Sequence, residues 1–156
     1  MKKLIWLLFI LSIAICFFGC KKAVENTDEY TTFYYKSYGA PWEYIYECLI
    51  DFEKKTLETT YANNRKEFNE KKYQKETINL TDEQINYLQK ALNYANVKSW
   101  KKQYDPEYPI CGGTSWRGYY KLKNGQEGFI RGNNAWPEDF ECISIAIPTT
   151  GSKFYK

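Results

Sequence analysis

Two alternating segments on either side of Asn124-Gly125 constrain the fold of this chain more than any other feature. Asn-Gly is the preferred dipeptide of a two-residue hairpin turn, because both residues tolerate a positive φ. The turn predicts a β-hairpin between Ser115–Lys123 and Gln126–Arg131, with Tyr120 directly opposite Phe129. In that register, one face of the hairpin collects four large apolar side chains, which we expect in the core: Trp116, Tyr120, Leu122 and Phe129.

The segment Leu80–Ala95 predicts an amphipathic helix. Thr81 and Gln84 have the spacing of a capping box, in which each side chain binds a free backbone N–H of the first turn. Four apolar residues repeat at helical spacing and form the expected buried stripe: Ile85, Leu88, Leu92 and Ala95. Val97 and Trp100 are expected to continue this packing beyond the helix end.

The first half of the domain predicts further strands. Tyr30–Tyr38 is rich in Tyr, Thr and Phe, which favour strands. Apolar residues alternate along Trp42–Phe52 and favour a strand, although a helix also aligns several of them. Glu53–Tyr61 is expected to turn and return as another strand, and the charged segment Ala62–Asn79 fits an exposed loop or a polar strand.

The last element is expected to be a helix that begins at Pro137, because proline suits the first helical position. Phe140, Ile143 and Ile147 share one helical face, but the alternation of Ile143, Ile145 and Ile147 leaves a final strand open. Together the elements predict one α+β domain over residues 30–156. Its expected core is an antiparallel sheet of about four or five strands, with one or two helices packed on one face.

The N-terminus has the three parts of a secretory signal peptide, over residues 1–19. Lys2-Lys3 provides a positive start, Leu4–Phe18 an apolar run, and Gly19 a small residue before cleavage. The residues Phe17–Cys20 resemble the lipobox of bacterial lipoproteins. That resemblance implies acylation of Cys20, residues 20–29 as a polar tether, and a membrane-anchored domain that faces the periplasm or the cell exterior. An uncleaved anchor and a plain secretory signal remain open.

A second resemblance covers about half of the mature chain. It runs through Thr81–Gln84, Trp100, Asp105, Pro109, Cys111, Gly113–Trp116, Asn124-Gly125 and Gly132–Pro137 to Phe140. These residues resemble those of uncharacterised small bacterial envelope lipoproteins. The resemblance implies a fold and a compartment, but it implies no activity.

Composition removes several classes of function. The chain has no histidine, so Ser-His and Cys-His nucleophile pairs are excluded, and no metal site or cofactor is expected. Loss of Lys2 and Lys3 with the signal lowers the formal net charge from +3 to about +1. Such a balanced chain gives no reason to expect a nucleic acid or an acidic polymer as partner. We therefore expect a non-enzymatic binding or interaction module.

The most suggestive candidate site surrounds the end of the hairpin. Aromatic rings and amides could stack on and hydrogen-bond a peptide, a glycan or an envelope protein. The candidate binding residues are Trp116, Arg131, Asn133, Asn134 and Trp136. The simpler interpretation is that the aromatic rings are core and that the two asparagines serve a turn. Replacement of Asn134 by Ala is expected to leave the fold intact and to weaken any binding.

Cys48, Cys111 and Cys142 remain after export, and an oxidising envelope favours a Cys111–Cys142 disulfide, with three reduced thiols as the alternative.

A cell-wall glycan hydrolase is the alternative function, and a purely structural domain is a third possibility. The carboxylates available to a hydrolase are Asp105, Glu107, Glu138, Asp139 and Glu141.

Cys20→Ala should release the protein from the membrane fraction, because the apolar run of the signal is too short to span a bilayer comfortably. Cell fractionation followed by immunoblotting measures the release. A variant that is still processed after Gly19 and still bound to membranes would contradict acylation at Cys20.

Overall fold

A computed structural model of the chain describes residues 27–39 and 44–151. The signal peptide and Cys20 lie outside the described residues, so acylation stays a prediction. The described part is α+β, as expected, but its sheet has seven strands instead of four or five. None of its helices is long and apolar enough to cross a membrane.

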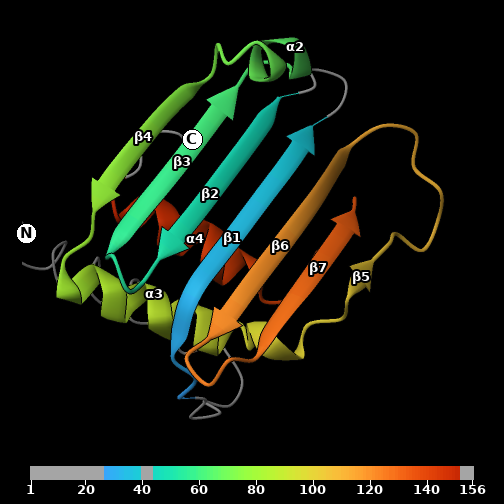
Figure 1. Cartoon of the computed structure of the whole chain (residues 1–156). Helices are drawn as coiled ribbons and strands as arrows, with labels where there is room; N and C mark the ends of the chain where they lie inside the picture. The colour runs from blue at the N-terminus through green and yellow to red at the C-terminus, as the bar shows by residue number, and fades with distance from the viewer. Residues whose placement is uncertain (1–26, 40–43, 152–156) are drawn as a thin grey trace, which may run out of the picture.

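The sheet runs in the order β4-β3-β2-β1-β6-β7-β5 (Figure 1). Neighbouring strands are antiparallel, except that the short β5 pairs with β7 in parallel. The strands are β1 (Tyr30–Gly39), β2 (Ile45–Asp51), β3 (Thr56–Ala62), β4 (Gln74–Asn79), β5 (Gln103–Tyr104), β6 (Thr114–Leu122) and β7 (Glu127–Asn133). The helices are α2 (Arg65–Asn69), α3 (Asp82–Tyr94) and α4 (Phe140–Thr149), and a 3₁₀ turn covers Val97–Ser99.

α3 and α4 pack together on one face of the sheet, which we call the inner face (Figure 1). Side chains of β1, β2, β3, β6 and β7 meet the two helices there. The fully buried members include Phe33, Ile50, Leu57, Leu88, Leu92, Trp116, Leu122 and Ile147. The other face, which we call the outer face, carries no described helix except the short α2 at one end.

Several expectations are confirmed. α3 begins after Thr81 with the complete capping box, and β2 is a strand instead of a helix. The predicted packing beyond α3 is also present, since Val97 is buried and Trp100 contacts the core. The segment Ala62–Asn79 holds both α2 and the strand β4.

The start of the last helix was predicted three residues too early. The final segment is a helix, but it begins at Phe140, and Pro137 lies in the turn before it. There the Pro137 carbonyl accepts a hydrogen bond of 3.1 Å from the backbone N–H of Phe140. Pro137 therefore shapes the entry to α4 from outside it.

The predicted register of the hairpin is wrong by one residue. Gly125 has a φ of 88°, whereas Asn124 does not adopt a positive φ. The Gly125 N–H donates to the Leu122 carbonyl at 3.0 Å, and Leu122 pairs with Gln126 across a three-residue loop. This is the type I turn with a bulge at glycine that is common in three-residue hairpins. Phe129 consequently lies opposite Tyr119 instead of Tyr120, and its side chain lies on the outer face.

Large rings on β6 packed over glycines on β7 explain this register. Gly132 lies opposite Trp116, and Gly128 lies opposite Tyr120. A Cβ atom at either glycine would overlap the facing ring, so each ring occupies space that only glycine leaves. The two-residue turn would instead have placed Arg131 on the inner face, and burial of an unpaired charge is costly.

Trp116→Ala should lower the free energy of unfolding by about 3–5 kcal/mol, because it empties a fully buried site. Phe129→Ala is the matched control on the opposite face. It should lower the free energy of unfolding by no more than about 1 kcal/mol, since Phe129 is 70% exposed and loses only its cross-strand contact with Tyr119. Urea unfolding followed by circular dichroism measures both values. The reverse order of the two effects would contradict the observed register.

Candidate functional site

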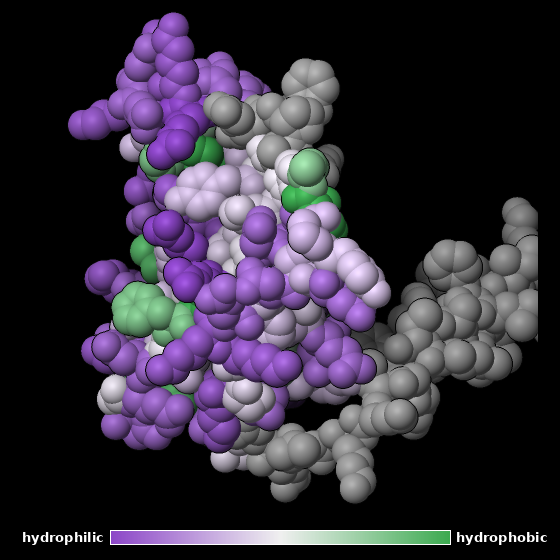
Figure 2. All heavy atoms as spheres, turned by 90° about the vertical axis from the view of Figure 1, so that its right-hand side faces the viewer, coloured by the Kyte–Doolittle hydropathy of each residue, from purple (hydrophilic) through white to green (hydrophobic). Residues whose placement is uncertain are grey.

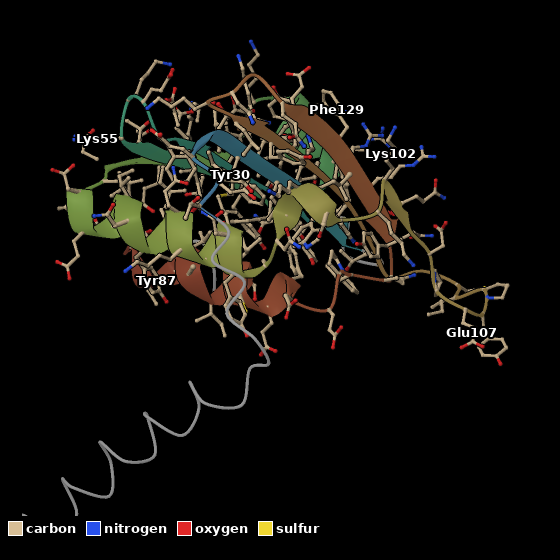
Figure 3. The ribbon with its side chains drawn as sticks, turned by 90° about the horizontal axis from the view of Figure 1, so that it is seen from below. Tyr30, Lys55, Tyr87, Lys102, Glu107 and Phe129 are labelled. Carbon is tan, nitrogen blue, oxygen red and sulfur yellow. The ribbon has the colours of Figure 1, made fainter. Side chains whose placement is uncertain are left out.

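The one-residue register change gathers a set of side chains on the outer face that the predicted hairpin would have separated. Three rows cross β1, β6 and β7 at directly paired positions. We call them the aromatic row (Tyr34, Tyr119, Phe129), the cation row (Lys36, Arg117, Arg131) and the polar row (Tyr38, Ser115, Asn133). Figure 3 shows Phe129 on the side of the sheet away from α3, with Lys102 at the edge beside β7.

The two tyrosine rings of the aromatic row are held in place by hydrogen bonds to carboxylates on strands of the same sheet. The Tyr119 hydroxyl donates to Glu127 at 2.8 Å, and the Tyr34 hydroxyl donates to Glu47 at 3.2 Å. The hydrogen bond to Glu127 raises the pKa of Tyr119; burial, followed by the charge of Glu47, raises the pKa of Tyr34. Both phenols therefore stay protonated, keep these bonds, and present their rings at fixed positions.

Phe129 is the most exposed member of this row, and its ring lies 4.8 Å from that of Tyr119 between centroids. Figure 2 shows that the side of the molecule carrying β7 and β5 is mostly hydrophilic, with hydrophobic residues scattered singly. Phe129 therefore adds one exposed ring, in contact with that of Tyr119, to a mostly hydrophilic surface.

Lys36 contributes little free charge to the cation row. Its ammonium forms an ion pair with Glu47, and it also lies over the rings of Tyr38 and Phe68, at 5.1 Å and 4.3 Å from their centroids. Only 14% of its side chain is exposed. Lys36 is therefore a partly buried, neutralised cation that fixes α2 onto the end of the outer face.

Arg117 and Arg131 differ from Lys36, because both are exposed and neither forms an ion pair among the described residues. They lie directly opposite each other on β6 and β7, an arrangement in which like charges are destabilising. The neutral Gln103 carbonyl accepts from Nε and Nη2 of Arg131 at 3.1 Å and 2.7 Å. These bonds orient Arg131 without neutralising it.

A cavity of about 380 Å³ adjoins the polar row, where β1 ends and β6 begins. Arg65 of α2 and Arg117 both line it, so it is bordered by two cations. Tyr38 and Ser115 add hydroxyl groups, and Ser115 donates to Asn133 at 3.1 Å. The cavity and the Arg117–Arg131 pair therefore form one continuous surface that favours negative charge.

The structure separates the five predicted candidate residues. Arg131 and Asn133 do share the outer face. Trp116 is 1% exposed in the core, where its indole N–H donates to the Ala135 carbonyl at 2.8 Å, so it is not available for binding. Trp136 is 40% exposed on the segment that leads to α4.

Asn134 directly follows β7, and its side chain holds the loop before β6 in place. It adopts a left-handed conformation with a φ of 52°. Its side chain accepts from the Thr114 N–H at 2.6 Å and donates to the Gly112 carbonyl at 2.7 Å. Replacement of Asn134 by Ala removes both hydrogen bonds, so the structure predicts that the loop before β6 is disturbed, contrary to the expectation from the sequence.

The predicted disulfide is not formed in this structure. Cys111 is an exposed thiol in the loop before β6, and Cys142 is half-buried on α4 with no disulfide bond to Cys111. Their pairing stays a prediction for the oxidised protein. Cys48 is fully buried on the inner face, and burial raises the pKa of its thiol to about 12.

The carboxylates proposed for a hydrolase all lie exposed, and none lines the cavity beside Arg117. Among the residues that the structure describes, no three Cys, Asp or Glu side chains are grouped so as to hold a metal ion. The surface with the most specific geometry is therefore the outer face.

Sequence reasoning identified only Arg131 and Asn133 among the nine residues of the three rows, and it missed Tyr34, Lys36, Tyr38, Ser115, Arg117, Tyr119 and Phe129. One signal was present in the sequence, because the predicted register would have placed Arg131 on the same face as Trp116, in the core. A comparison with models of known protein families and with curated proteins finds no match to this chain. The functional argument therefore depends on the geometry of the outer face.

The described thiols should react with a maleimide at very different rates. Cys111 should react first, whereas Cys48 should react only after unfolding, because the thiolate is the nucleophile and burial suppresses it. Mass spectrometry at neutral pH, with and without prior reduction of the protein, measures both, with Cys111→Ser as the control that lacks the fast reaction. Protection of Cys111 and Cys142 together until a reductant is added would establish the disulfide; early labelling of Cys48 would contradict the fold.

Proposed function

We propose that this chain is a lipid-anchored protein of the bacterial cell envelope, and that its domain is a non-enzymatic binding module. The module contacts its ligand through the outer face of the sheet. It belongs, in this proposal, with the small envelope lipoproteins that it resembles. Anchoring is argued from the signal and from Cys20, and binding is argued from the outer face.

The single observation that supports binding is the aromatic row beside an arginine pair on a sheet face that no described helix covers there. Each tyrosine of the row is tied by its hydroxyl to a carboxylate, so its ring is ordered before a ligand arrives. Such preorganisation lowers the entropic cost of binding. A purely structural domain would have no need to hold exposed rings and unpaired arginines together.

The start of the described chain limits how far the domain could lie from the proposed anchor. Asp28 forms an ion pair with Lys98 at 2.6 Å, and Glu29 forms one with Lys123 at 2.8 Å, so this end of the tether is fastened to the domain. Only residues 21–26 then separate Thr27 from Cys20, which limits their distance to about 25 Å. The binding surface would accordingly work close to the membrane that carries it.

A photoreactive phenylalanine analogue at position 129 of the full-length chain should form covalent adducts with an envelope component in intact cells. The same analogue at position 145 is the control, because Ile145 is 54% exposed on α4, the helix packed on the inner face. Immunoblotting of the irradiated cells measures the adducts. Equal adducts from both positions, or none from position 129, would contradict the outer face as the binding surface.

A further inference from the structure

We propose, on the basis of the proposed function, that the ligand of the outer face is an acidic polysaccharide whose sugar rings carry carboxylate groups. The sugar rings lie on the aromatic row, and the carboxylates lie on Arg117 and Arg131. The nearly balanced net charge of the sequence gives no indication of such a ligand, because net charge does not show where cations lie together. The fold places two unpaired arginines side by side and neutralises the third cation of their row with Glu47.

The arginine pair has the properties of an incomplete anion site. Directly opposed like charges are unfavourable on a sheet, and a bound carboxylate would convert that repulsion into attraction to both groups. Gln103 occupies Nε and one donor group of Arg131, which fixes the plane of the guanidinium. Nη1 of Arg131 then has no partner among the described residues and is free to donate to a carboxylate.

Gln103 is itself held in place, because its amide N–H donates to the carboxylate of Asp105. Asp105 thus contacts the amide group and forms no ion pair with Arg131. A chain of two bonds therefore orients the arginine while it keeps its positive charge. This arrangement is a reason to assign Arg131 a binding role instead of a merely solvated one.

The shape of the surface favours a chain of sugar rings over a peptide. An extended peptide that lies flat on a sheet face would bury its own backbone N–H and C=O groups without partners, because the backbone groups of the sheet are already paired. Peptides instead add to a sheet at its edge, where free backbone groups are available. A sugar ring presents C–H groups on its faces and hydroxyls around its rim. Its apolar face can therefore stack on Tyr119 or Phe129 while its rim remains hydrated.

The carboxylates around the arginine pair disfavour a nucleic acid, whose closely spaced phosphates require a long surface of cations. Glu47 lies on one side of the pair, and Glu127 lies beyond the aromatic row on the same face. Nucleic-acid surfaces instead follow the phosphate backbone with many Lys and Arg residues. The cavity lined by Arg65 and Arg117 adds one further place where an acidic sugar unit can enter from the same surface.

Titration calorimetry of the full-length lipoprotein in detergent tests the proposal. The probe is an oligogalacturonate, and its methyl ester is the matched uncharged control. The free acid should bind, and the ester should bind at least about tenfold more weakly, because it cannot form charge-assisted hydrogen bonds to arginine. Arg117→Ala and Arg131→Ala should each weaken binding of the acid by about tenfold.

Lys75→Ala is the control for a general loss of charge. Lys75 also lies on the outer face, but it is at the far edge of the sheet and is paired with Glu58. This variant should bind the oligogalacturonate as the wild type does. Phe129→Ala should also weaken binding, and circular dichroism should show that it remains folded.

Equal binding of the acid and the ester would overturn the proposal, and so would unchanged binding by the two arginine variants. Tighter binding of polyglutamate or of a thymidine oligonucleotide would overturn it as well. If position 129 still cross-links in cells while the oligogalacturonate does not bind, this inference fails and the proposed function stands. If neither occurs, both fail.

Discussion

The close packing of two aromatic rings over two glycines determines most of what is distinctive in this protein. Trp116 covers Gly132, and Tyr120 covers Gly128, so β6 and β7 fit together in only one register. A shift by one residue would bring side chains into the space of the rings and would bury Arg131. The bulge at Gly125 supplies the extra residue that this register needs.

This register connects the core to the surface. On the inner face it places Trp116 against Phe140, with ring centroids 5.9 Å apart, and directs the indole N–H to Ala135. The chain then turns through Asn134, which holds the loop before β6. On the outer face the same pairing aligns Phe129 with Tyr119, and Arg131 with Arg117. Core packing and the candidate binding surface are therefore two consequences of one constraint.

The outer face also explains how a chain with almost balanced charge can favour an anion. Most cations of the face have a carboxylate close by: Lys36 pairs with Glu47, Lys75 with Glu58, and Lys121 lies opposite Glu127. Arg117 and Arg131 have no such carboxylate partner among the described residues, and their charge lies next to the aromatic row. Net charge cannot reveal such a local surplus, because it averages over positions that the fold separates.

The sequence by itself determined the elements whose signals are local. The capping box of Thr81 and Gln84 and the apolar stripe of α3 depend on contacts within a few residues, so they could be predicted, as could the α+β class. Register, strand number and the membership of each face depend on contacts between distant segments. Asn124-Gly125 permits both a two-residue and a three-residue loop, and only the fit of Trp116 and Tyr120 onto the glycines of β7 decides between them. The resulting register places Phe129 and Arg131 on the outer face. It buries Trp116, which the sequence analysis had considered for binding.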